Sequence, residues 1–217
     1  VDPEEKRRIL TTIIIGGGPT GVELAGAVSE LGRSMIARDF RFLDQEDVRV
    51  VLIEAGPRVL SAFPDALSHY AETYLRKIGV TIRTGSAVDE VREGLVRIGG
   101  EEIAAGCIVW AAGIKASPVA RWLGVEAGPG GRVPVDGHLA VKGVEDVHLI
   151  GDAALAVDAG GKPLPALAQV AKQQGEYLGA LLRRPPASMA TARPFVFRNR
   201  GNTAVVGRNA AIFDFGT

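Results

Sequence analysis

The stretch Thr11-Thr-Ile-Ile-Ile-Gly-Gly-Gly-Pro-Thr-Gly-Val-Glu-Leu-Ala-Gly26 decides the fold. Its first five residues are all β-branched, which is typical of a buried parallel strand. Glycines follow with the spacing Gly-x-Gly-x-x-Gly at Gly16, Gly18 and Gly21, and apolar residues then recur at helical intervals. A strand, a glycine turn and a helix in this order predict a loop that binds the diphosphate of a dinucleotide. A glycine turn without a ligand is the alternative.

Each glycine of this loop has its own physical task. Gly16 makes the tight turn, Gly18 lets a diphosphate approach the backbone, and Gly21 lets the helix pack against the strand. Pro19 and Thr20 lie between them, at the start of the predicted helix. The first N–H groups of a helix lack backbone partners and carry partial positive charge, so they attract phosphate oxygens. We therefore assign the whole loop, with Pro19 and Thr20, to cofactor binding.

Glu54 follows the second predicted strand, Val48–Ile53, where a carboxylate can accept both ribose hydroxyls of an adenosine. Such an acid usually lies about 20 residues beyond the glycines. Here it follows Gly21 by 33 residues, and we attribute the excess to a polar insertion over Ser34–Asp47. A carboxylate repels a 2′-phosphate, which favours NADH over NADPH, whereas Arg58 is placed to receive that phosphate. An exposed charge at a strand end is the alternative for Glu54.

The order of elements predicts an α/β fold: a Rossmann-like doubly wound parallel sheet, with helices on both faces and a β-meander. The first domain, predicted over residues 8–113, further contains a helix after Pro64, a strand at Val80–Arg83, the meander over 87–105 and a strand at Cys107–Ala111. A second unit over residues 114–217 is predicted to contain a strand at Val147–Ile150, a helix from about Pro165 to Leu182, and strand-like pieces at Phe195–Phe197 and Thr203–Val206.

Composition excludes several functions. Of 217 residues, 25 are basic and 25 acidic, so the chain lacks the net positive charge that non-specific nucleic-acid binding requires. Cys107 is the single cysteine, which excludes an internal disulfide; we expect it to be a small core residue of a buried strand. The three histidines have no metal-ligand spacing, so we expect no metal site. No apolar run approaches the roughly 18 residues of a transmembrane helix.

Five motifs together resemble one family of flavoproteins. They are Gly16-Gly-Gly-Pro-Thr-Gly-Val-Glu-Leu-Ala-Gly26, Val51-Leu-Ile-Glu-Ala-Gly-Pro-Arg-Val-Leu60, Val109-Trp-Ala-Ala-Gly-Ile114, His148-Leu-Ile-Gly-Asp-Ala-Ala154 and Ala168-Gln-Val-Ala-Lys-Gln-Gln-Gly175. In this order they resemble the type II, non-proton-pumping NADH dehydrogenases, within the FAD-dependent pyridine nucleotide-disulfide oxidoreductase superfamily. The resemblance covers nearly the whole chain.

The resemblance implies an NADH:quinone oxidoreductase with the cofactors NADH and FAD. Hydride would pass from NADH to FAD, and the electrons then to a quinone. A related flavin-linked reductase with ferredoxin, oxygen or a disulfide as partner is one alternative, and a non-catalytic NADH-binding sensor is another. The lack of a cysteine pair in this chain counts against the disulfide branch.

The resemblance also implies roles for individual residues. The loop glycines and Glu54 would hold the NADH, with Ala112 and Gly113 lining the same cleft. Glu23 resembles the family's acid beside the nicotinamide; its alternative is a carboxylate favoured by the helix dipole.

A second set of residues would lie near the flavin. Gly151 and Asp152 resemble the motif whose carboxylate binds the ribityl chain of FAD, although such an Asp is otherwise a turn residue. Gln169 and Gln173 match two glutamines near the flavin and the quinone, and Gln169 would also contact the cofactor. Their spacing alone favours a solvated polar face. The helix start near Pro165 would direct its positive end at the flavin.

The chain also differs from a complete family member. It resembles a fragment without the N-terminal FAD-binding Rossmann segment and without the C-terminal membrane-associating region. Residues 114–217 would then be the incomplete C-terminal portion of the FAD-binding domain. We expect the whole protein to be cytoplasmic, peripheral on the cytoplasmic face of a membrane, and a homodimer.

Overall fold

The computed structural model describes residues 2–189 and 191–215, which form two compact units. The first unit contains the described residues up to Gly113 and those from Gly201 onward, and the second spans Ile114–Arg200. The chain passes from the first unit to the second after Gly113 and returns after Arg200. The final segment was expected in the second unit and lies in the first instead.

A parallel four-stranded sheet forms the centre of the first unit, which confirms the predicted fold class. Its strands are β1 (Thr11–Ile15), β2 (Arg49–Ile53), β3 (Val80–Arg83) and β7 (Cys107–Trp110). They lie in the order β3-β2-β1-β7, and all neighbours are parallel. The direction of the strand order reverses at β1. In open α/β sheets, ligands bind beyond the carboxyl ends of the strands at such a reversal.

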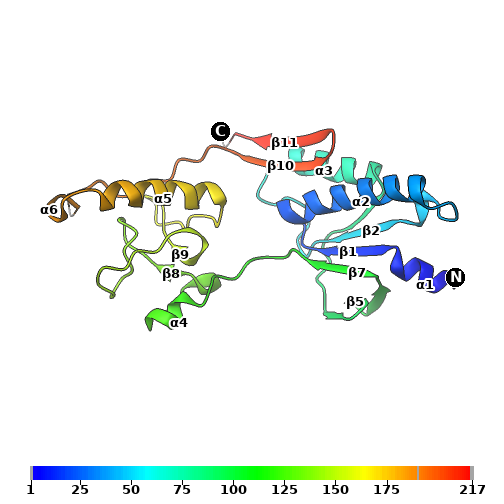
Figure 1. The fold of residues 1–217 in the computed structure, drawn as a ribbon, viewed down its shortest axis with the longest axis horizontal. Helices are drawn as coiled ribbons and strands as arrows, with labels where there is room; N and C mark the ends of the chain where they lie inside the picture. Colours follow the sequence, from blue (N-terminus) through cyan, green and yellow to red (C-terminus); the bar gives the residue numbers. More distant parts are fainter. Residues whose placement is uncertain (1, 190, 216–217) are drawn as a thin grey trace. The chain divides into compact units, whose positions relative to one another are not determined.

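The two faces of this sheet are covered by different kinds of element. Helices α2 (Pro19–Asp39) and α3 (Asp65–Lys77) lie on one side, whereas β5 lies on the other (Figure 1). Alternate residues of β1 serve the two faces: Ile14 belongs to the core under the helices, and Ile13 and Ile15 to the core under the meander. The expectation of helices on both faces was therefore wrong, because the meander takes the place of a crossover helix.

The meander consists of β4 (Glu90–Arg92), β5 (Leu95–Ile98) and β6 (Glu101–Ala104), paired antiparallel as predicted. The chain then returns to the parallel sheet through β7. Since β7 is the last strand in the sheet order, one of its edges has no partner strand within the described part of the chain. Cys107 on β7 is exposed, so its expected burial in the core was wrong.

Helix α2 is longer than the sequence indicates. It ends at Asp39, and a 3₁₀ turn (η1, Gln45–Asp47) leads into β2. Residues 34–39, expected in a polar insertion, are therefore almost two further helical turns. A short helix, α1 (Pro3–Ile9), precedes β1.

A hairpin of β10 (Asn202–Gly207) and β11 (Ala210–Asp214) completes the first unit. Its apolar residues Ala204, Val206 and Ile212 belong to the core that contains Ile14 and Leu52. The hairpin approaches α2 at Gly26, where an added Cβ would collide with the carbonyl oxygen of Val206. This packing explains why the segment joins the first unit.

The second unit has a core of its own and less regular structure. Its elements are α4 (Val119–Leu123), η2 (Pro129–Gly131), β8 (Val133–Pro134), η3 (Gly151–Ala153), β9 (Ala154–Leu155), α5 (Ala168–Leu182) and α6 (Pro186–Met189). The expected helix exists but begins at Ala168. The expected strands at Val147–Ile150 and Phe195–Phe197 were wrong: the first makes an isolated bridge at His148, and neither forms a ladder.

Candidate dinucleotide-binding site

Gly16 lies where three strands end. Its N–H donates to the carbonyl of Ile53 at the end of β2, over 2.8 Å. Its φ is +113°, and an added Cβ would lie 2.7 Å from the carbonyl carbon of Ala111, just beyond β7. Any side chain would be both strained and in collision here, so the turn after β1 requires glycine.

Gly18 and Gly21 differ in what surrounds them. A Cβ on Gly21 would collide with the carbonyl oxygen of Gly16, so this glycine allows α2 to begin directly against the loop. A Cβ on Gly18 would meet no atom within 4 Å, and its φ of −72° suits any residue. Gly18 is thus not required by packing within the described chain, and it borders open space.

The start of α2 has the features of an anion site. Gly18 is the N-cap and offers no side-chain cap, Pro19 occupies the first turn, and Pro19 and Thr20 are exposed. The first N–H groups of the helix therefore face the space beside Gly18, together with the positive end of the helix dipole.

Glu54 reaches the glycine loop. Its Oε2 accepts a hydrogen bond from the N–H of Gly17 at 2.6 Å, and its Oε1 accepts one from Gly56 at 2.7 Å. The residue is half-buried, so it is more than an exposed charge at a strand end. A carboxylate has about four lone-pair sites. With one donor on each oxygen, both oxygens keep capacity for a ribose hydroxyl.

Arg58 is engaged elsewhere. Its guanidinium donates to the carbonyls of Leu60, Ser61 and Phe63 and lies 3.2 Å from the carboxylate of Asp65. These contacts fix the turn that leads into α3. They direct the guanidinium to backbone carbonyls rather than to a 2′-phosphate.

Ala112 and Gly113 follow β7, the other neighbour of β1. Gly113 is exposed, with a φ of +75° that favours glycine. The carbonyl of Ala112 accepts a hydrogen bond from the indole of Trp110 at 2.9 Å. The residues after β7 and the glycine loop therefore lie at the same edge of one sheet.

Glu23 points to the hairpin. Its Oε1 accepts a hydrogen bond from the N–H of Val205 on β10 at 3.0 Å, and the residue is exposed. Glu30 lies two helical turns further along α2, and both of its carboxylate oxygens accept a hydrogen bond from the N–H of Arg208. Both acids thus hold backbone groups of the hairpin in this structure.

In the second unit, Gly151 and Asp152 begin the turn η3. Gly151 has a φ of +70°, and its N–H donates to Oε1 of Gln174 at 2.7 Å. Asp152 is exposed. The turn lies against the first part of α5, because a Cβ on Gly151 would be 3.6 Å from that of Ala171.

Gln169 and Gln173 both bind the extended segment 198–200. Gln173 donates to the carbonyl of Arg198 and accepts from its N–H, each at 3.0 Å. Gln169 accepts from the N–H of Arg200 at 3.2 Å and donates to the side chain of Asn199 at 3.5 Å. The two amides are therefore held by backbone and not merely solvated.

The sequence reasoning missed Gln174, although a signal existed. The buried residues of α5 are Val170, Gln174 and Leu181, which share one helical face. Applying the helical period from Val170 would have placed Gln174 in the core. Arg132 was also missed; it donates to the carbonyls of Ala154 and Leu164.

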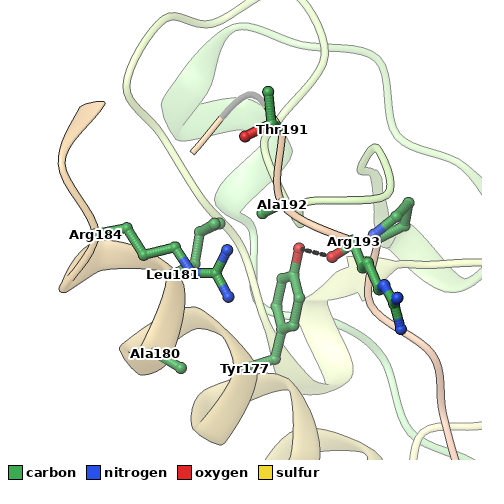
Figure 2. A pocket seen from close by; sticks show the side chains of 8 residues that line it. Tyr177, Ala180, Leu181, Arg184, Thr191, Ala192 and Arg193 are labelled. Carbon is green, nitrogen blue, oxygen red and sulfur yellow. Dashed lines mark hydrogen bonds between the residues drawn. The ribbon is translucent and has the colours of Figure 1, made fainter. Parts of the chain in front are cut away.

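A separate cavity of about 470 Å³ lies on the second unit between α5 and residues 191–194 (Figure 2). Tyr177, Leu181, Arg184 and Arg193 contribute to its wall, and it includes none of the predicted site residues. Within residues 2–189 and 191–215, no three His, Cys, Asp or Glu side chains gather to hold a metal ion. Among the helices described there, none is both long and apolar enough to cross a bilayer.

The fold and the loop define a Rossmann-like α/β protein with a glycine-rich first turn. Residues 2–175 match the sequence model of the pyridine nucleotide-disulphide oxidoreductases. The chain belongs to that family.

Its relatives include quinone reductases. The chain is 36% identical over 225 residues to an internal alternative NAD(P)H-ubiquinone oxidoreductase A1, mitochondrial, of Arabidopsis thaliana, covering 99% of this chain and 44% of the relative. It is 34% identical to the type II NADH:quinone oxidoreductase Ndh of Mycobacterium tuberculosis, covering 99% and 48%. The chain thus spans about half the length of the curated relatives it matches.

A solved structure shares the fold. The NDH2 of Plasmodium falciparum in complex with NADH superposes with a TM-score of 0.84 at 17% identity, covering 100% of this chain and 59% of that one.

Proposed function

We propose that this chain is the NADH-binding part of a flavin-dependent NADH:quinone oxidoreductase. The observation that carries the proposal is the hydrogen bond between Gly17 and Glu54, which places a carboxylate directly beside an open glycine loop. The sequence identity to two quinone reductases supports the choice of electron acceptor.

Each predicted site residue of the first unit has a role in this proposal. The N–H groups at the start of α2 bind the diphosphate, and Gly18 leaves room for it. Glu54 accepts the ribose hydroxyls and disfavours a 2′-phosphate by charge repulsion. Glu23 is proposed to lie beside the nicotinamide, and Ala112 with Gly113 to border the same cleft.

The second unit is proposed to contribute to a flavin site. The exposed carboxylate of Asp152 would bind the ribityl chain, and Gln169 and Gln173 would lie near the flavin and the quinone. The buried amide N–H of Gln174 beside the Gly151 turn has no partner among the described residues, which fits a site that receives a polar group. Bound FAD would accept a hydride from NADH and transfer the electrons onward to a quinone. The chain's own residues bind and orient the two nucleotides.

The decisive experiment measures NADH oxidation by the whole protein with soluble quinones. We expect a yellow protein whose turnover depends on added quinone. If NADH oxidation required ferredoxin, oxygen or a disulfide and did not proceed with any quinone, the proposed electron acceptor would be wrong. A colourless protein that binds NADH would instead indicate a sensor.

Glu54 allows a sharper test of nucleotide choice. Glu54→Arg should weaken NADH binding and relatively favour NADPH, because it replaces a repelling charge by an attracting one. Glu54→Gln is the matched control for the loop, since it keeps one acceptor without the charge; we expect about tenfold weaker NADH binding. Titration of both nucleotides by protein fluorescence measures this, and an unchanged preference in Glu54→Arg would remove Glu54 from the ribose site.

The proposal includes peripheral association with the cytoplasmic face of a membrane, and a homodimer. Both rest on the family resemblance. Flotation of the whole protein with liposomes and sedimentation velocity test them separately.

A further inference from the structure

Gln174 is the most deeply buried polar side chain of α5. Its exposed fraction is 0%, and it shares its helical face with Val170 and Leu181, which are both apolar and buried. A neutral amide on such a face is costly unless its polar atoms are paired. Its Oε1 is paired, with the N–H of Gly151 at 2.7 Å.

This bond holds a conformationally demanding turn. Gly151 has a φ of +70° and begins η3, and Asp152 is the next residue. Glycine is the most flexible residue, so its turn geometry depends on external contacts. The N–H of Gly151 donates to the oxygen of this buried amide, which fixes the Ile150–Gly151 peptide plane at the start of the turn from which Asp152 projects.

The other end of the same amide is unsatisfied. Nε2 of Gln174 is buried and has no hydrogen-bond partner among the described residues. Nε2 and Oε1 are bonded to one carbon, so the unpaired donor lies beside the Gly151 turn. Buried unsatisfied donors are rare and call for an explanation, such as a ligand or a missing partner. The turn is thus prepared for a further polar group.

We propose that Gln174 is a positioning residue for the flavin-binding turn: it holds the N–H of Gly151 and thereby aims Asp152 at the ribityl chain. This inference rests on the proposed function, which assigns that turn to FAD. It adds a residue that acts through Asp152 without touching the reacting atoms.

The test compares three variants of the whole protein. Gln174→Met keeps the length and volume of the side chain and removes the acceptor, whereas Gln174→Glu keeps an acceptor for Gly151. Leu181→Ala is the control for general loss of packing: it lies on the same buried face, seven residues and about 10 Å further along α5. The readouts are the FAD dissociation constant, from flavin fluorescence, and hydrogen exchange at Gly151 in the flavin-free protein.

We expect Gln174→Met to bind FAD about tenfold more weakly and to exchange the Gly151 amide faster. Gln174→Glu keeps an acceptor, so exchange at Gly151 should stay closer to the wild type than in Gln174→Met, and Leu181→Ala should lose thermal stability while binding FAD normally. Equal FAD affinity in Gln174→Met and wild type would overturn the inference. So would equal weakening in Gln174→Met and Leu181→Ala.

The two hypotheses fail in different ways. If the wild-type protein bound no FAD, the proposed function would fail, and the assignment of this turn to a flavin with it. If the wild type bound FAD and Gln174→Met bound it as tightly, only the role of Gln174 would fail. Unchanged exchange at Gly151 in Gln174→Met would likewise contradict the positioning role, independently of any flavin.

Discussion

At the glycine loop, the two carboxylate oxygens of Glu54 accept hydrogen bonds from two different segments, through Gly17 and Gly56. Hydrogen bonds to a charged group contribute about 1.5–3 kcal/mol each. Glu54 therefore holds the loop in shape as well as offering oxygens to a ribose. The position of Glu54 after β2 follows from the sequence, but its bond to Gly17 does not, because that contact joins residues that follow two separate strands.

Two glycines of the loop are expected to have different roles: Gly21 allows close packing, and Gly18 leaves room for a ligand. Gly18→Ala should leave the free energy of unfolding within about 0.5 kcal/mol of the wild type, because no atom lies near its Cβ. The same variant should weaken NADH binding about tenfold if the diphosphate approaches there. Gly21→Ala should instead destabilise the first unit by about 1–3 kcal/mol, because its Cβ collides with Gly16. Urea unfolding and NADH titration measure the two effects; a destabilised Gly18→Ala would contradict this division.

Tyr177 makes the stability of the second unit depend on pH. Burial raises the pKa of Tyr177, and the nearby Asp136 adds to the shift. A raised pKa means that the folded state holds the phenol proton more tightly, so this contribution is complete below the unfolded pKa of about 10 and lost above it. We expect unfolding free energy to fall as pH rises through that range. Tyr177→Phe should flatten this part of the profile, and an identical slope in both proteins would refute the assignment.

Among the elements, α2 depends on the hairpin that covers it. Glu23 and Glu30 accept backbone N–H groups of the hairpin, and Gly26 between them allows the close approach. These three positions lie on one face of the helix. The spacing of Glu23, Gly26 and Glu30 is visible in the sequence. The hairpin residues that they contact lie about 180 residues further along the chain, so no local pattern could reveal these contacts.

Two glycine substitutions test this packing. In a helix interior, alanine is favoured over glycine by up to about 1 kcal/mol. Gly179→Ala on α5 should show that gain, because its Cβ would meet no atom within 4 Å. Gly26→Ala should lose about 1–3 kcal/mol instead, because its Cβ collides with the carbonyl of Val206. Thermal unfolding measures the stability of both variants. A Gly26→Ala protein more stable than the wild type would show that the hairpin does not pack closely on α2.

The elements also show where local patterns are sufficient. β1, the glycine loop and the start of α2 follow from periodicity and turn chemistry that lie within one short window. Val147–Ile150 is equally apolar, yet its pairing with residues 139–141 stops at one isolated bridge, between His148 and Ala140. Residues 34–39 continue α2, and Ile36 extends its buried face two turns beyond Ser29, so the expected helix end lay too early.

For the whole molecule, the chain passes between the two units twice, after Gly113 and after Arg200. Lys115 and Arg200 are exposed near these passages. Limited trypsin digestion should therefore cut after both, and the peptide that begins at Gly201 should remain bound to the N-terminal fragment through the hairpin core. Native size-exclusion chromatography with mass spectrometry identifies the fragment to which this peptide stays bound. Release of that peptide with the fragment containing α5 would contradict the division into units.

The split core of the first unit has a consequence for the nascent chain. Ile14 and Leu52 leave the ribosome before the second unit is made, whereas Ala204, Val206 and Ile212, which pack into the same core, are made after it. At about 5–20 residues per second, synthesis of the intervening second unit alone takes roughly 4 to 17 s. During that interval the apolar surface that the hairpin later covers on the first unit stays exposed. A chaperone that binds such surfaces would find its longest opportunity there, before the hairpin emerges.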